Sequence, residues 1–136
     1  MNFHATFCAP LQPDIIDLGN IEKENVVSEF QNISWNKYLE AMKGKPDNEI
    51  YYSPSFEFEN TENNNSLSIS AVGEPENFEF YIFYKRPKTV KSFWGFSQKE
   101  VKEYLTDVTG QTNEDALNCI KALINNDLEF LERKIK

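Results

Sequence analysis

The sequence has little of the chemistry on which disulfide frameworks and acid–base enzymes depend. Its 136 residues include only two cysteines, Cys8 and Cys119, and one histidine, His4. The cysteines are too few for a disulfide scaffold and lack the spacing of zinc ligands. A catalytic nucleophile needs a neighbouring base, and His4 is the only histidine that could serve as one. The glycine-rich loops that bind phosphate are missing as well. We therefore expect no enzymatic activity, no cofactor and no metal site.

Long apolar runs are also missing. No stretch approaches the roughly 20 residues that a membrane-spanning helix needs. The N-terminal stretch MNFHATFCAP has no Lys or Arg before its apolar residues, unlike a signal peptide, and Pro10 interrupts it. We expect a cytoplasmic protein that does not contact membranes.

Basic residues are absent from a long acidic stretch. The formal net charge is −8, and the first 80 residues carry fourteen acidic against four basic side chains. Between Asp47 and Glu79 there are eight acidic residues and no basic one. Such a field repels phosphate and attracts a basic partner. We therefore expect no nucleic-acid-binding surface there, and the charge favours a basic protein partner.

Helical periodicity first becomes clear after Ser34, which is a candidate N-cap. The apolar residues at i, i+3, i+4 and i+7 are Trp35, Tyr38, Leu39 and Met42. Gly44 and Pro46 then end the helix. Residues 1–33 show no clear period, and the apolar residues within 26–33 fit either a strand or a helical turn.

After this helix, the spacing of apolar residues changes from that of a helix to the two-residue period of a strand. Phe56 and Phe58 alternate with Glu57 and Glu59, as in a half-buried strand. Pro54 cannot donate a ladder hydrogen bond, which predicts an edge strand or a bulge. Two more strands follow in SLSISAV and FEFYIFYK, and a turn at KRPK leads to a fourth. The pattern predicts a four-stranded antiparallel meander.

Two helices are expected after the meander. Ser97 and Thr112 each stand three residues before an acidic residue, the spacing of a capping box. They predict helices over 97–110 and 112–135, and Asn125-Asn126 favours a kink or a break in the second. The expected fold is a single α+β domain, residues 1–136, with the helices packed on one face of the sheet.

This arrangement predicts a core between the last helix and one face of the sheet. The expected core residues are Phe56, Phe58, Leu67, Ile69, Phe80, Ile82, Leu117, Ile120, Ile124 and Leu131.

The other face of the sheet carries aromatic rings that need a cover. By strand alternation, Tyr81 and Phe83 point away from the core, and Phe93 is expected beside them. Burying each ring stabilises by roughly 1.5–3 kcal/mol. The cover is either residues 1–33 of the chain or another protein, meaning a basic partner or a second copy in a homodimer. Stacking on nucleic-acid bases is disfavoured because acidic residues surround these rings.

The sequence thus predicts a protein-binding face with aromatic anchors and an acidic rim. Its expected residues are Glu57, Glu59, Glu62, Glu74, Glu76, Glu79, Tyr81 and Phe83.

A small acidic α+β chain without catalytic motifs, with such an aromatic and acidic face, resembles the immunity proteins of bacterial toxin–immunity systems. The resemblance implies an inhibitor that binds a cognate, basic toxin domain and occludes it. The chain is also similar in profile to acidic secretion chaperones of the type III kind, which bind an extended effector segment. Against that alternative, the strands of such chaperones are interrupted by a helix, whereas residues 50–96 indicate consecutive strands.

Overall fold

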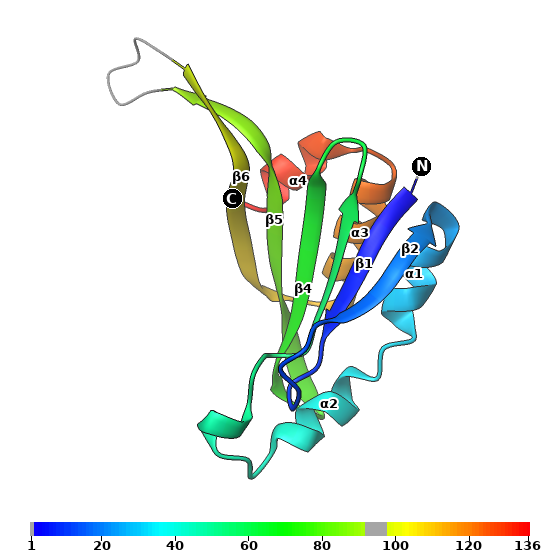
Figure 1. Ribbon diagram of the computed structural model, residues 1–136, viewed down its shortest axis with the longest axis vertical. Helices are drawn as coiled ribbons and strands as arrows, with labels where there is room; N and C mark the ends of the chain where they lie inside the picture. Colours follow the sequence, from blue (N-terminus) through cyan, green and yellow to red (C-terminus); the bar gives the residue numbers. More distant parts are fainter. Residues whose placement is uncertain (1, 92–97) are drawn as a thin grey trace.

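The computed structural model describes residues 2–91 and 98–136, and its centre is one six-stranded antiparallel sheet (Figure 1). The strand order across the sheet is β2-β1-β3-β4-β5-β6. The strands are β1 (Asn2–Cys8), β2 (Ile16–Glu22), β3 (Ser55–Asn60), β4 (Asn65–Glu74), β5 (Asn77–Lys91) and β6 (Gln98–Gln111). The α+β class is therefore as predicted, but the sheet has six strands and not four.

The helices pack behind the sheet in the view of Figure 1, apart from α2 at its lower end. They are α1 (Lys23–Gln31), α2 (Trp35–Met42), α3 (Asn113–Ile124) and α4 (Leu128–Lys134), with a short 3₁₀ turn at Asp47–Glu49. In the part of the chain that is described, no helix is long and apolar enough to cross a membrane.

The core forms where the helices meet one face of the sheet. The register places Phe7, Phe56, Ile69 and Ile82 side by side on four successive strands. Ile120 on α3 and Leu131 on α4 are fully buried against this face. The predicted core is confirmed, except that Leu117 is only partly buried.

The predicted helix over 97–110 is wrong, because Gln98–Gln111 form β6. Ser97, its expected cap, lies outside the described residues. Tyr104 and Val108 are four residues apart, which fits a helix. With Thr106 between them they also fit the two-residue period of a strand. Pairing with β5 from one end of β6 to the other satisfies the backbone of this segment and decides the outcome.

The predicted turn at KRPK is also wrong, since β5 continues to Lys91. Pro87 lies where the register between β5 and β6 shifts, between Arg86 and Lys88. A proline without an amide donor is tolerated at such an irregularity. Beyond Lys85, β5 has left β4, so the β5–β6 hairpin projects from the sheet as an arm (Figure 1).

Residues 1–33 form β1, β2 and α1, which the sequence pattern left open. β1 pairs with β3, so β3 is an inner strand and not the edge strand that Pro54 suggested. Pro54 stands just before β3, where its missing donor costs nothing, and its carbonyl accepts the Ala71 amide at 3.1 Å.

The two C-terminal helices begin and separate as predicted. The Thr112 hydroxyl accepts the Asp115 amide, and the Asp115 carboxylate accepts the Thr112 amide, which completes a capping box. The break comes at Asn126, whose φ of 60° is in the left-handed region that asparagine tolerates.

Candidate functional site

The strand register defines an open face, the side of the sheet away from α1, α3 and α4. One row across it runs through Thr6, Glu57, Ser68, Phe83 and Asp107 on five neighbouring strands. The next row runs through His4, Glu59, Ser66, Lys85 and Leu105. Tyr81 and Glu79 lie on the same face by strand alternation along β5.

Residues 1–33 do not cover this face, so one of the two expected covers is excluded. β1 and β2 extend the sheet sideways, and α1 packs on its opposite face with α3. Tyr81 and Phe83 are half-buried by their neighbours alone, and Leu105 beside them is 57% exposed. Phe93, expected in the same group, lies outside the described residues.

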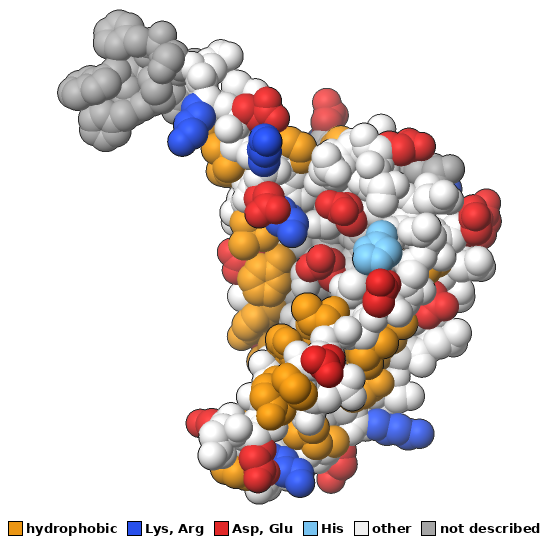
Figure 2. Space-filling model, in the orientation of Figure 1, with side chains coloured by type: hydrophobic (Ala, Val, Ile, Leu, Met, Phe, Trp, Pro, Cys, Tyr) orange, Lys and Arg blue, Asp and Glu red, His pale blue; other side chains and the backbone are white. Residues whose placement is uncertain are grey.

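Acidic side chains stand on the open face next to these apolar groups. Glu57 and Glu59 on β3 are half-buried, and Glu79 on β5 is exposed. Asp17 adds a further acid, and its Oδ1 lies 2.9 Å from His4 Nε2. The Gly19 amide and His4 both hydrogen-bond this carboxylate and lower its pKa. Figure 2 shows this face, with red acidic groups around the pale-blue histidine and orange apolar groups toward β5 and β6.

Three of the expected rim residues lie at the ends of the sheet. Glu62 is in the turn between β3 and β4, whereas Glu76 is in the turn between β4 and β5. The Glu74 carboxylate lies 3.6 Å from Lys43 Nζ at the end of α2, so the chain's own lysine already faces it. The face therefore brings together Glu57, Glu59, Glu79, Tyr81 and Phe83.

A shallow trough runs along the middle of the face because β4 presents small side chains there. Ser66 and Ser68 line a hollow of about 230 Å³, walled by Glu57 on one side and by Phe83 and Leu105 on the other. A second hollow of about 230 Å³ is lined by Glu59, Asn64, Lys85, Lys102 and Glu103.

The sequence pattern missed Lys85, Leu105 and Asp107 as members of this face. Lys85 was assigned to a turn, and the other two to a helix. The sequence signal for β6 is weak: Tyr104, Thr106 and Val108 have the spacing of a strand, but Leu105 between them is apolar.

Neither cysteine is activated as a nucleophile. Burial, and to a lesser degree Glu57, raises the pKa of Cys8. Burial raises the pKa of Cys119 to about 11. Because the thiolate is the reactive form, both shifts lower reactivity at neutral pH. Within residues 2–91 and 98–136, no three His, Cys, Asp or Glu side chains gather as metal ligands.

Comparisons with protein-family models, with curated proteins and with solved structures find no match for this chain.

Proposed function

We propose that the chain is an immunity-type inhibitor that binds a basic toxin domain on the open face of its sheet and occludes it. The observation that supports this most is the shared row of Glu57 and Phe83, two strands apart, on a face that the described helices leave uncovered. Acidic and aromatic groups at this spacing suit a basic protein surface.

The aromatic side of the face supplies the anchoring part of such an interface. Tyr81 and Phe83 are held on an inner strand, and Leu105 adds an exposed aliphatic group beside Phe83. Their half-buried rings lose little side-chain freedom on binding. Aromatic side chains in the middle of an interface commonly supply most of its binding energy.

The charged side of the face supplies steering and selectivity. Asp17 on β2 and the pair Glu57 and Glu59 on β3, with only β1 between them, form an acidic band beside the trough. Lys85 interrupts the acidic pattern. A complementary partner surface is therefore mainly basic, with an acidic group opposite Lys85.

Affinity capture from cells that naturally produce the protein tests the proposal. We expect the wild-type chain to retain a basic protein that the double variant Tyr81→Ala with Phe83→Ala loses. Phe130→Ala, an aromatic truncation in the helical layer, is the matched control and should retain it. Circular dichroism verifies that both variants are folded.

The captured protein is then expressed alone and together with the chain. The proposal predicts that it is toxic or enzymatically active alone and that the wild-type chain suppresses this activity. A captured protein that binds only as an unfolded segment, with no activity to suppress, would overturn the inhibitor proposal and favour the secretion chaperone.

A further inference from the structure

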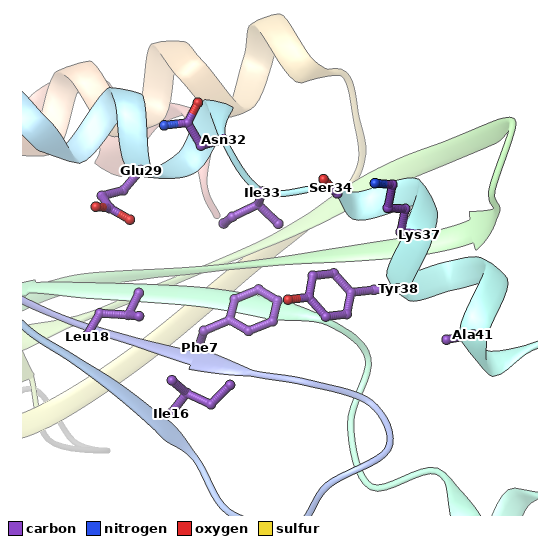
Figure 3. A pocket seen from close by; sticks show the side chains of 10 residues that line it. All are labelled: Phe7, Ile16, Leu18, Glu29, Asn32, Ile33, Ser34, Lys37, Tyr38 and Ala41. Atoms are coloured by element: carbon purple, nitrogen blue, oxygen red, sulfur yellow. The ribbon is translucent and has the colours of Figure 1, made fainter.

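An apolar groove lies on the helical side of the sheet, where α1 and α2 stop short of the edge strand β2 (Figure 3). Its volume is about 700 Å³, within the range of 300–1,000 Å³ that is usual for ligand sites. We call it the β2 groove. Its lining residues are Phe7, Ile16, Leu18, Glu29, Asn32, Ile33, Ser34, Lys37, Tyr38 and Ala41.

The groove exists because the chain passes from α1 to α2 in three residues and turns away from β2. Phe7 and Tyr38, with ring centroids 5.0 Å apart, form its inner wall. Ile16 and Leu18 form the β2 side, and Leu18 remains 38% exposed. Apolar surface left open in this way gains free energy when another apolar group covers it.

Polar groups without partners stand around the apolar lining. Ser34 is the N-cap of α2, yet its side chain makes no capping hydrogen bond. Figure 3 shows the Tyr38 hydroxyl directed toward the Phe7 side of the groove, and among the described residues it has no hydrogen-bond partner. These hydroxyls are available to the backbone of a bound polypeptide.

The charge around the groove favours a basic occupant. Residues 14–40, which build most of it, carry six acidic and two basic side chains. Glu29 and Lys37 both line the groove, so the excess of acidic charge comes from the residues around it and not from the lining itself. An apolar group carried between Lys or Arg residues matches this environment better than one carried between acids.

The groove is continuous with the open face across a single strand. In β2, Asp17 turns toward the open face and contacts His4, while its neighbours Ile16 and Leu18 line the groove. Ile15, just before β2, is 57% exposed beside this edge. A polypeptide bound to the acidic band therefore reaches the groove by crossing β2.

We propose that the β2 groove is a second contact for the same basic protein partner and receives an apolar anchor flanked by Lys or Arg. This rests on the proposed function. The partner inserts a side chain into the groove and does not add a strand to the edge of β2. The Gly19 amide is already bonded to Asp17 Oδ1 at 2.7 Å, and a register irregularity interrupts β2 at the same place.

Two capped dipeptides test the groove without the partner. They are N-acetyl-Trp-Arg-amide and N-acetyl-Trp-Glu-amide, titrated into the ¹⁵N-labelled chain and followed by amide chemical shifts. We expect the arginine peptide to shift amides of β2 and of residues 29–41 at millimolar concentration, and to bind about five-fold more tightly than the glutamate peptide.

Leu18→Glu should abolish these shifts, whereas Leu11→Glu, an equally exposed leucine that does not line the groove, should retain them. Glu57→Lys with Glu59→Lys should also retain them, because the open face is not involved. The amide spectrum of each variant shows whether it is folded.

Absence of shifts, or equal affinity for the two dipeptides, would overturn the proposal. So would groove shifts that depend on protein concentration without peptide, which would identify a second copy as the occupant. Once the partner is captured, Leu18→Glu should raise its dissociation rate about ten-fold. If the dipeptide binds and this rate is unchanged, the groove is not a contact of that partner, while the open-face proposal stands.

Discussion

Arg86 is the most deeply buried charged side chain in the part of the chain that is described, and it ties the arm to the helices. Its guanidinium lies 2.7 Å from Glu132 Oε2 and 3.0 Å from Glu132 Oε1 on α4. It also donates to the Tyr84 carbonyl and the Thr106 hydroxyl, and it lies over the Tyr84 ring. Because the donors are satisfied, the charge is tolerated in the core.

The first prediction concerns Glu132. Hydrogen bonding to Arg86 lowers the pKa of Glu132 below its ordinary value of 4.5. The folded-state pKa is lower, so the carboxylate stabilises the fold above pH 4.5, and this contribution is lost as the pH falls through the folded-state pKa. Glu132→Gln should lower the free energy of unfolding at pH 7 by about 1–3 kcal/mol, because a buried charge loses its counter-charge.

Urea titrations at several pH values measure this effect. The difference from the wild type should be constant near neutrality and shrink below pH 4.5. Glu129→Gln on the same helix, whose side chain is 92% exposed, should change the free energy of unfolding by less than about 0.5 kcal/mol at any pH. A Glu132→Gln effect independent of pH would mean that the carboxylate does not act through its charge.

Ile120 gives the second prediction, for the core. It is fully buried on α3, facing the sheet. Ile120→Ala should lower the free energy of unfolding by roughly 2–5 kcal/mol, because it removes buried methylene groups and leaves a cavity. Denaturant titration measures the loss, and a change under about 0.5 kcal/mol would mean that this helix face is packed loosely.

At the scale of elements, the features that the sequence predicted correctly are those that neighbouring residues decide. The helix at Trp35, the Thr112 cap and the break at Asn126 depend on neighbours within a few residues. The strands β1 and β6 depend on partners that are remote or ambiguous in the sequence. Residues 98–111 have a mixed period, and β1 pairs with β2 on one side and on the other with β3, about fifty residues away.

The third prediction concerns the hairpin between β4 and β5. Gly73 has a φ of 132°, and a Cβ there would lie 2.9 Å from the Asn77 carbonyl oxygen and 3.0 Å from Phe78 Cα. Both atoms belong to the backbone and cannot move aside easily. Gly73→Ala should therefore lower the free energy of unfolding by about 2 kcal/mol or more, since backbone strain and a clash combine.

Gly44→Ala provides the comparison for this prediction. Gly44 has a φ of 75°, but a Cβ there would meet nothing within 4 Å. Its cost should be only the left-handed backbone penalty of about 1 kcal/mol. Equal losses in the two thermal or urea titrations would show that the close approach at Gly73 relaxes without cost.

At the scale of the whole molecule, acidic and aromatic side chains share one face of the sheet, the face that the described helices do not cover. Alternation along β3 and β5 was sufficient to place Glu57, Glu59, Tyr81 and Phe83 on one face. It was insufficient to show that the face is uncovered, because that depends on where residues 1–33 go. The β2 groove was equally invisible, since it forms between α1, α2 and an edge strand that gave no clear sequence signal.

The association rate with the captured partner tests the central claim most directly. Acidic groups that steer a basic partner act through a field that is screened over about 8 Å at physiological salt. Glu57→Lys with Glu59→Lys should slow association about ten-fold or more at low salt and flatten its salt dependence. Glu114→Lys with Glu129→Lys makes the same change in net charge in the helical layer and should alter the rate far less.

Surface plasmon resonance at low and high salt gives these rates, and it should also show that Tyr81→Ala acts mainly by faster dissociation. The account predicts a large loss of association rate for the open-face pair and a small loss for the helical pair. Equal effects of the two pairs, or an unchanged rate for the open-face pair at low salt, would contradict the assignment of the open face as the docking surface.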